Sequence, residues 1–452
     1  MSKKIVSMLC LSLCLMLVFS ACGSDAVVSN TPSSTTSAVS KNEEPSEGPV
    51  EISVIMPVGY KEYFDEVLIT KFEETYPGIT IKAIYNNEAT ALLQQQLAAG
   101  GGPDIISSQG TTALIDYART GHIIPIDSYA DEYGWRDSFS AWAYPPVSLN
   151  GSLYGLPGKL DSEFVYYNKE LFAENGFEIP KSYEELEALC EQIQALGIMP
   201  FAFGNSDYKY ATEWWWSLAF TCGMNPSTLE SVLKGDIPWN SPEPTNAMAK
   251  MLNLYERGFI NDKQSTAMTM DAATQLFSTG KAAMKMEGTW LISNITTIYA
   301  PDFDWGVFSM PAWADGVEQT MPFALGVALG INSKCKNPDA AAKFLDIYAQ
   351  RESQLLGLSY NGMGIPPIDN ADLSAIDGIA PQVVEMQNIM NEYTAKGATS
   401  YLAWTYWGQQ TRVYTCENID ALWLGQIDLE TFMDEMQKKA EEDKANGKLF
   451  NW

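Results

Sequence analysis

The feature that most constrains the fold is an alternation of strand-like and helix-like segments early in the chain. Residues 51–56 and 79–84 alternate apolar and polar side chains, and a short apolar run follows at 104–106. Between them, 60–76 and 88–99 carry apolar residues at helical spacing. This β-α-β-α-β order predicts a largely parallel sheet covered by helices. Ligands of such sheets bind in the loops beyond the carboxyl ends of the strands.

A second informative stretch is GSLYGLPGKLDSEFVYYNKELF, residues 151–172. A loop punctuated by Gly and Pro precedes an extended apolar run at 164–167, and a helix is expected to begin at Asn168. We expect the chain to cross here from one lobe into another. Asp161, just before the strand, is then expected to face a ligand held between the lobes.

Later segments predict a second α/β body and then a return of the chain to the first lobe. Ser182 and Glu185 form a capping box that begins a helix, and helices and short strands continue to Thr289. The apolar run within 317–331 predicts a buried strand, followed by Asn337 as a helix cap before a proline. If this strand joins the first sheet, the chain crosses back, and several crossings between two lobes would form a hinge.

The N-terminus has the layout of a secretion signal. Two lysines precede the apolar run 5–19, and small residues then precede Cys22. This resembles a bacterial lipobox with Phe19 in the usual place of Leu, so we expect 1–21 to be a signal peptide and Cys22 to be lipidated. An uncleaved membrane anchor is the alternative. Residues 22–49 are expected to be a disordered tether, because they contain few large apolar side chains.

Charge and length restrict the partners. The formal net charge of −28 opposes binding to nucleic acid and favours neutral or cationic ligands. The roughly 400 residues after the tether suit two lobes rather than one core. Cys190, Cys222, Cys335 and Cys416 lie far apart without a neighbouring His, which argues against a metal site and leaves disulfides open. We expect a monomer without a cofactor.

Several pieces in order resemble the extracellular solute-binding proteins of ABC importers, in the carbohydrate-binding group that includes maltose-binding protein. They are KFEETYPGITIKA, GGPDIISSQ, GSLYGLP with YYNKELF, the helix from Ser182 with GIMPF, LFSTGKAAMKMEGTWLISNI and PFALGVALGINSKCKNPDAAAKFLDIY. The resemblance implies an α/β fold of two lobes with mostly parallel sheets. We expect 50–162 and 312–370 in lobe one, and 163–311 and 371–452 in lobe two.

The resemblance also implies the function and the site. The protein would close on a sugar in the cleft between the lobes and deliver it to a membrane-embedded permease, without catalysis. Ser108 and Tyr60 depart from the maltodextrin-binding pattern, so the sugar stays open. The candidate ligand contacts are Asp161, with Glu163 as a second acid, Trp290, Trp214, Trp215, Trp404, Trp407, Gln109, Thr111 and Tyr60.

These residue types suit a sugar, because carboxylates accept strong hydrogen bonds from hydroxyls and aromatic faces cover apolar C–H surface. Each of these residues could also have a purely structural role. Asp161 could be an exposed acid of a loop, Trp290 could pack in the core, and Trp404 and Trp407 could belong to a stripe of core residues. Three successive tryptophans, 214–216, cannot share one buried helix face, so at least one is expected to face the cleft or solvent.

Other functions remain open at this stage. They are a binding protein for a non-sugar solute, a two-carboxylate glycoside hydrolase, and a sensor-associated or adhesive surface protein. His122 is the only histidine, which leaves no Ser/His/Asp set and no His-based metal site.

Overall fold

A computed structural model describes residues 50–295, 303–360, 364–369, 371–373, 376 and 379–449. The predicted signal peptide (1–21), the lipidation site Cys22 and the tether (22–49) lie outside the described residues. Within the described part, no helix combines the length and apolarity needed to span a membrane.

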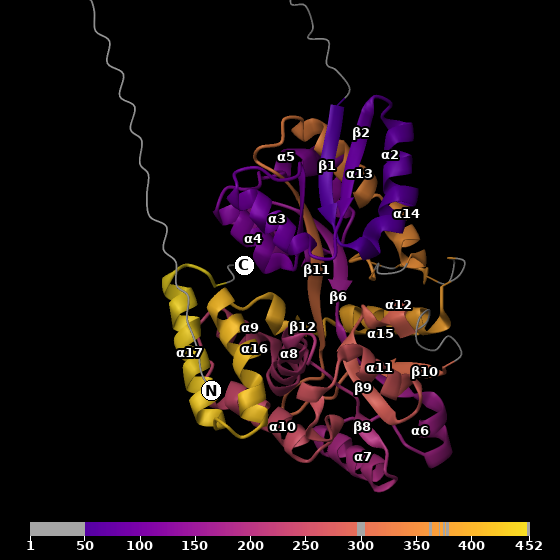
Figure 1. The fold of residues 1–452 in the computed structure, drawn as a ribbon, viewed down its shortest axis with the longest axis vertical. Helices are drawn as coiled ribbons and strands as arrows, with labels where there is room; N and C mark the ends of the chain where they lie inside the picture. Colours follow the sequence, from indigo (N-terminus) through magenta and orange to yellow (C-terminus); the bar gives the residue numbers. More distant parts are fainter. Residues whose placement is uncertain are drawn as a thin grey trace, which may run out of the picture. The chain divides into compact units, whose positions relative to one another are not determined.

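The first sheet has six strands in the order β12-β11-β3-β1-β2, with β6 also paired to β11 (Figure 1). Strand β1 lies parallel to β2 and β3, whereas β11 lies antiparallel to β3 and β6 and parallel to β12. The bounds are β1 Val50–Met56, β2 Ile79–Tyr85, β3 Ile105–Gln109, β6 Leu156–Asp161, β11 Met321–Ile331 and β12 Thr399–Tyr401. The three predicted N-terminal strands and the returning strand are thereby confirmed.

Helices surround this sheet, and we call the resulting body the first lobe. The predicted helix after β1 is confirmed as one run that passes through a π-helical segment, and the helix after β2 is confirmed as α3. The bounds are η1 Val58–Tyr60, α1 Lys61–Tyr63, η2 Phe64–Ile69, α2 Thr70–Thr75, α3 Ala89–Ala98, α4 Thr111–Arg119, α5 Asp127–Tyr133, η3 Trp135–Asp137, η4 Ala141–Ala143, η5 Pro145–Val147, α13 Pro338–Ala349, α14 Arg351–Leu356 and η10 Gly357–Ser359. A small hairpin joins β4 Ser148–Leu149 to β5 Ser152–Leu153.

The second sheet has four strands in the order β10-β7-β9-β8. Their bounds are β7 Glu163–Asn168, β8 Met199–Phe201, β9 Ala282–Gly288 and β10 Trp305–Phe308. We call the body built on this sheet the second lobe. The chain passes from the first sheet to the second within one residue, because Asp161 pairs with Ala324 of β11 and Glu163 pairs with Gly288 of β9. The predicted crossing is therefore confirmed at Ser162.

The strand directions in the second sheet differ from the mostly parallel prediction. Only β8 and β9 run parallel, whereas β7 lies antiparallel to β9 and β10. The reason is the crossing itself: β7 leaves the boundary between the sheets at Glu163, and β9 returns to the same boundary at Gly288. Because β7 begins at this boundary and β9 ends there, the two neighbouring strands must run in opposite directions.

The helices of the second lobe share its aromatic core with the strands and loops. Their bounds are α6 Lys169–Asn175, α7 Tyr183–Ala195, η6 Lys209–Ala211, α8 Thr212–Gly223, α9 Pro226–Leu233, α10 Pro242–Glu256, η7 Asn261–Lys263, η8 Ser265–Ala267, α11 Met270–Ser278, α12 Leu291–Asn294, α15 Pro381–Lys396, η12 Ala403–Thr405, α16 Gln409–Trp423 and α17 Leu429–Ala445. Strand β12 lies among these segments along the chain yet pairs with β11 of the first sheet. The predicted placement of 371–452 wholly in lobe two therefore does not match this strand, and the lobe bounds stay a prediction.

Two predicted caps behave differently. The Ser182 side chain accepts a hydrogen bond from the Glu185 N–H at 3.2 Å, as a capping residue should. The Glu185 carboxylate reaches back to the Lys181 N–H at 2.7 Å rather than to Ser182. Asn337 precedes α13 but makes no side-chain cap hydrogen bond, so the helix begins with Pro338 at its first turn instead.

None of the three tryptophans of helix α8 faces solvent, and the other half of the expectation, that one of them faces the cleft, stays a prediction for Trp214. Trp214, Trp215 and Trp216 are all buried, because every residue of α8 is buried and the helix packs against α10, α16, β9 and β11. The expectation assumed a helix with one exposed face. A helix enclosed on all sides can bury three successive side chains in three different directions.

The N-terminus of α16 is held by a buried acid from the next helix. Asp443 of α17 accepts hydrogen bonds from the N–H groups of Gln410 and Thr411 at 3.0 and 2.9 Å, and from the Thr411 hydroxyl at 2.8 Å. A Cβ atom at Gly408 would lie 2.3 Å from this carboxylate, which explains the glycine. Asp443 therefore fixes α16 against α17.

We expect Asp443→Ala to lower the free energy of unfolding by about 2–3 kcal/mol, because it leaves buried backbone donors without an acceptor. Urea denaturation followed by circular dichroism measures this. The exposed Glu441→Ala on the same helix serves as control, with an expected change within about 0.5 kcal/mol. Equal effects for the two variants would contradict the capping role.

Candidate functional site

The crossing between the sheets places two acids side by side along the chain. Asp161 ends β6 and is 4% exposed, and Glu163 begins β7 and is fully buried. The Asp161 carboxylate lies against Gly326 at a bulge of β11, where a Cβ atom would be 2.0 Å from Oδ2. Any larger residue at Gly326 would displace the acid. Glycine here is a packing requirement of the site.

Asp161 has a cationic neighbour on its own strand. The Lys159 ammonium lies 3.5 Å from Asp161 Oδ1 and 5.8 Å from the centre of the Trp290 ring. Burial raises the pKa of the Asp161 carboxyl, and the charge of Lys159 opposes that shift. The 3.5 Å contact of Oδ1 with Lys159 falls short of hydrogen-bond geometry, and beyond this ion pair the described residues give Oδ1 no donor. An acceptor oxygen therefore remains available to a ligand.

Glu163 is the more exceptional of the two acids. Neither of its carboxylate oxygens has a partner in hydrogen-bond geometry within the described residues. Burial raises the pKa of Glu163 well above its usual range, and repulsion from Glu213 and Asp161 adds to the shift. The nearby Trp404 indole lowers this pKa but only partly offsets the burial.

Three tryptophans lie beside these acids. The Trp290 ring centre is 4.9 Å from that of Trp214 and 6.4 Å from that of Trp404. Trp290 donates its indole N–H to Glu287 at 3.0 Å. A Cβ atom at Gly288 would lie 2.1 Å from the Trp290 ring, so the glycine allows this ring to fold onto the end of β9.

Two ion pairs border the tryptophans. Arg412 of α16 makes two hydrogen bonds of 2.7 Å to the buried Glu213 of α8, and its guanidinium lies 6.0 Å from the centre of the Trp404 ring. Burial raises the pKa of Glu213, and Arg412 opposes this. Lys285 and Glu287, both buried, form the second pair at 2.8 Å. Bidentate pairing with Arg holds the Glu213 carboxylate in one orientation.

We call this group the carboxylate–tryptophan cluster. It joins residues of both sheets with residues of two helices and the segment before α16. Its members are Lys159, Asp161, Glu163, Glu213, Trp214, Lys285, Glu287, Trp290, Trp404 and Arg412.

The structure thus brings together five of the predicted contacts: Asp161, Glu163, Trp214, Trp290 and Trp404. Their joint placement agrees with a shared site. Their roles as ligand contacts stay predictions.

Trp215 and Trp407 lie elsewhere. Trp215 is fully buried with its ring 5.2 Å from that of Phe201, and Trp407 is 2% exposed with its ring 5.7 Å from that of Trp216. These contacts are core packing of the second lobe. We therefore leave Trp215 and Trp407 out of the candidate site.

The first-lobe candidates border the cluster in different ways. Tyr60 is buried close enough to Asp161 for the acid to raise its pKa, although burial is the larger cause. Gln109 is exposed at the end of β3, where the next N–H donates to the Gly326 carbonyl. Thr111 is buried and its hydroxyl donates to the Thr405 carbonyl at 3.5 Å, a contact next to Trp404.

Sequence reasoning did not select the partners of the acids as site residues. Lys159 could have been found, because residues two apart on a strand point to the same face and Asp161 was already a candidate. No comparable sequence pattern links Arg412 or Glu287 to the site. Their relevance arises from contacts between segments far apart in the chain.

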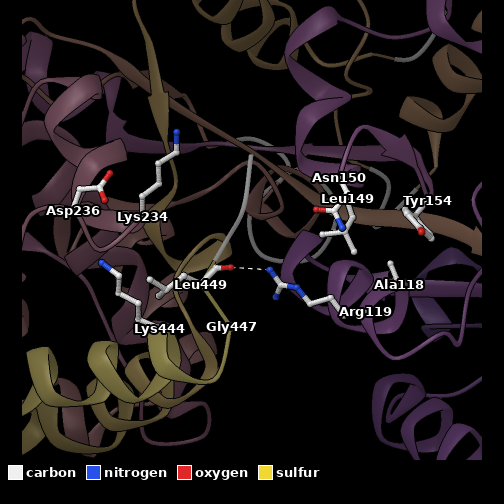
Figure 2. A pocket seen from close by; sticks show the side chains of 10 residues that line it. All are labelled: Ala118, Arg119, Leu149, Asn150, Tyr154, Lys234, Asp236, Lys444, Gly447 and Leu449. Atoms are coloured by element: carbon white, nitrogen blue, oxygen red, sulfur yellow. Dashed lines mark hydrogen bonds between the residues drawn. The ribbon is translucent and has the colours of Figure 1, made fainter.

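Two hollows lie apart from the cluster. One of 720 Å³ lies between α4, the β4–β5 turn and the end of α17, and Arg119, Lys234 and Lys444 line it (Figure 2). Its cations already have partners: Arg119 donates to the Leu449 carbonyl and Lys444 to the Gly235 carbonyl. The other, of 200 Å³, is lined by Trp142, Phe323 and Tyr406 among others.

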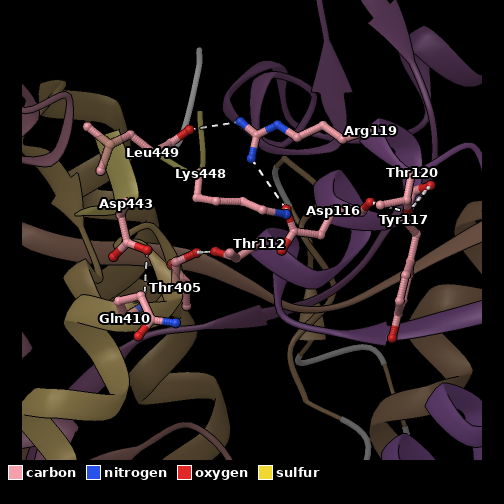
Figure 3. Close-up of polar contacts among 10 residues, drawn as sticks. All are labelled: Thr112, Asp116, Tyr117, Arg119, Thr120, Thr405, Gln410, Asp443, Lys448 and Leu449. Atoms are coloured by element: carbon pink, nitrogen blue, oxygen red, sulfur yellow. Dashed lines mark hydrogen bonds and ion pairs between the residues drawn. The ribbon is translucent and has the colours of Figure 1, made fainter. Parts of the chain in front are cut away.

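Polar contacts beside the larger hollow join the two lobes. Figure 3 shows Asp116 and Arg119 of α4 facing the residues that follow α17. Arg119 donates to the Leu449 carbonyl at 2.8 Å, and the Lys448 ammonium lies 3.2 Å from Asp116. The Thr112 hydroxyl donates to the Thr405 carbonyl at 2.5 Å. The first two contacts hold the first lobe against the residues after α17, and the third holds it against the segment that carries Trp404.

Residues 58–355 match the family model described as bacterial extracellular solute-binding protein. A putative binding protein of Brucella abortus is 29% identical over 334 residues, which are 71% of this chain and 78% of that protein. A maltodextrin-binding protein of Bacillus subtilis is 25% identical over 320 residues, 69% of this chain and 72% of that protein.

A solved structure of a chitin oligosaccharide binding protein is similar with a TM-score of 0.77 at 22% identity. The similarity covers 88% of this chain and 100% of that one. This similarity confirms the predicted two-lobed α/β fold.

Arg412→Met tests the electrostatics of the cluster. We expect it to lower the free energy of unfolding by about 2–4 kcal/mol at neutral pH, because Glu213 stays buried without its counter-ion. Since Arg412 lowers the pKa of Glu213, its loss raises that pKa further. The destabilisation should therefore be smaller at about pH 5 than at about pH 8, because acid favours the uncharged form of Glu213.

Urea denaturation at both pH values measures this. The double variant Glu213→Gln, Arg412→Met should recover part of the loss, because no buried charge remains. A loss that is independent of pH and unchanged in the double variant would contradict the pairing.

Proposed function

The chain belongs to the family of bacterial extracellular solute-binding proteins, and from this premise we propose that it captures a sugar between its two lobes for uptake. We propose that a membrane-embedded ABC permease receives the sugar. The maltodextrin-binding relative supports a sugar as the solute. Members of the family are binding proteins, and we propose that this chain likewise binds its ligand without catalysis.

One observation supports this most directly: buried acceptor oxygens without a well-formed hydrogen bond lie beside tryptophan faces. Among the described residues, Asp161 Oδ1 has the Lys159 ammonium at 3.5 Å, and the Glu163 oxygens have the Trp404 indole nearby, but none of these oxygens receives a hydrogen bond of good geometry. Buried acceptors in this state are costly, at about 1–3 kcal/mol each, unless a ligand supplies donors. A sugar supplies hydroxyl donors at its edge and apolar C–H faces for rings such as Trp290 and Trp404.

Access to this site requires movement of the lobes. The four acids, Trp214 and Lys285 are buried, whereas Lys159, Trp290, Trp404 and Arg412 are half-buried, and the two hollows are lined by other residues. We propose that the lobes separate around the crossing at Ser162 to admit the ligand. The contacts of Asp116 and Arg119 with Lys448 and Leu449 would then break on opening and form again on closure.

We further propose that the mature protein is a lipoprotein on the extracellular face of the membrane. The support is the sequence before Cys22, with a flexible tether behind it that would let the lobes reach a permease. A single acyl chain binds membranes only marginally, whereas several chains on one cysteine anchor stably.

A glycan screen tests the ligand. We expect mono- or oligosaccharides to raise the melting temperature and change the tryptophan fluorescence, because a ligand at 100 times its dissociation constant stabilises by about 2.7 kcal/mol. Asp161→Asn should weaken binding of a responding sugar about 10–100-fold, since it replaces a charged acceptor. The exposed Asp131→Asn in the first lobe is the matched control.

The outcomes separate the alternatives. A response to amino acids or peptides with silence across all sugars would remove the carbohydrate proposal. Hydrolysis of a responding glycan would favour a glycoside hydrolase. Unchanged affinity in Asp161→Asn would take Asp161 out of the site.

Cys22→Ser tests the anchor. We expect the wild-type chain, expressed in a bacterium with a lipoprotein pathway, to sediment with membranes and to incorporate labelled fatty acid at Cys22. The variant should appear in the soluble or secreted fraction without label. Labelled Cys22→Ser protein, or an unlabelled wild type, would contradict lipidation at this residue.

A further inference from the structure

The acids and cations of the carboxylate–tryptophan cluster are not equal in number. Four acids, Asp161, Glu163, Glu213 and Glu287, face three cations, Lys159, Lys285 and Arg412. Each cation lies with a particular acid: Lys159 with Asp161, Lys285 with Glu287, and Arg412 with Glu213. Glu163 is the acid of the cluster that forms no ion pair with any cation in the described part of the chain.

The surroundings of Glu163 make this imbalance costly. Its side chain is fully buried, and neither oxygen has a hydrogen-bond partner among the described residues. The ionisable groups that act on it from neighbouring elements are the acids Asp161 and Glu213, and its own charge acts on the Cys222 thiol. All of these are acids or neutral groups. A buried carboxylate among acids is stable only with a positive partner or a bound proton.

The aromatic neighbours fit a positive partner as well as a sugar. The Trp404 indole lies beside Glu163, and the Trp404 ring touches Trp290. Tryptophan faces attract cations, and Lys159 and Arg412 already lie over Trp290 and Trp404 at 5.8 and 6.0 Å. The whole chain carries a net charge of −28, which attracts a cation toward the cleft.

We propose that the ligand is an amino sugar with a free, positively charged amine, and that Glu163 is the residue that selects this amine. The inference rests on the proposed sugar-binding function. Asp161 and the tryptophans would bind the hydroxyls and ring faces, as they would for any sugar. The amine supplies the one positive charge that the cluster lacks and donates hydrogen bonds to the two unpartnered Glu163 oxygens.

Calorimetry on the full mature chain tests this with sugars that differ in one substituent. Glucose, glucosamine and N-acetylglucosamine form one set, and galactose, galactosamine and N-acetylgalactosamine form another. The β-1,4 tetramers of glucose, glucosamine and N-acetylglucosamine form a third. We expect an amine to bind at least about tenfold more tightly than the matching hydroxyl or acetamide. Spermidine is included as an amine without a sugar.

Glu163→Gln should abolish this preference while leaving a residual response to the sugar. The exposed Glu170→Gln, which follows the same strand, should keep the preference. In the absence of ligand, Glu163→Gln should melt at a higher temperature than the wild type at neutral pH. Because burial raises the pKa of Glu163, the wild type loses stability as pH rises past the usual carboxyl range, so this gain should shrink in acid.

The failures are distinguishable. Binding of neutral sugars at least as tightly as their amines, unaffected by Glu163→Gln, overturns the amine inference and leaves the proposed function standing. Neutral-sugar binding that weakens as pH rises, with the pH dependence lost in Glu163→Gln, also overturns it, because Glu163 is then protonated in the complex. Silence to every sugar set, with or without a response to spermidine, overturns both proposals.

Discussion

The site depends on one constraint, the single residue of chain between the two sheets. Asp161 is fixed by its register with Ala324 of β11, and Glu163 by its register with Gly288 of β9. Ser162 between them belongs to neither strand, and its carbonyl accepts the Thr289 N–H at 3.0 Å. A chain held this tightly on both sides cannot move its acids away from the boundary between the lobes. Any rotation about this point changes the surroundings of both carboxylates.

The glycines around this boundary serve the same constraint. Gly326 leaves room for the Asp161 carboxylate, and Gly288 leaves room for the Trp290 ring. The acids therefore lie close to backbone and to aromatic rings rather than to water. Because little solvent reaches the acids, burying their charges is costly, and oxygens without a hydrogen bond there point to a ligand that supplies donors. A ligand gains binding energy at such a site when it donates hydrogen bonds to carboxylate oxygens that the folded protein leaves without a donor.

Much of the fold could be predicted from sequence. The β1–β3 unit, the crossing after Asp161 and the return at β11 follow from local periodicity and punctuation. The strand directions of the second sheet and the pairing of β12 with β11 could not, because they depend on where distant strands end. Trp290 and Asp161 were found through a family motif, whereas the pair of Glu213 and Arg412 joins residues about 200 positions apart. Trp214 and Trp215 could not be told apart from the sequence for a related reason, since neighbouring residues of an enclosed helix differ only in what surrounds them.

Fluorine NMR of the protein labelled with 5-fluorotryptophan can show whether a ligand is held against the tryptophans at the boundary of the lobes. Thirteen tryptophans give separate signals, which single Trp→Phe variants assign. We expect a bound sugar to shift the signals of Trp214, Trp290 and Trp404 most, and to leave those of the core residues Trp135 and Trp313 unchanged. Shifts confined to other tryptophans, with these three signals unmoved at saturating ligand, would contradict it.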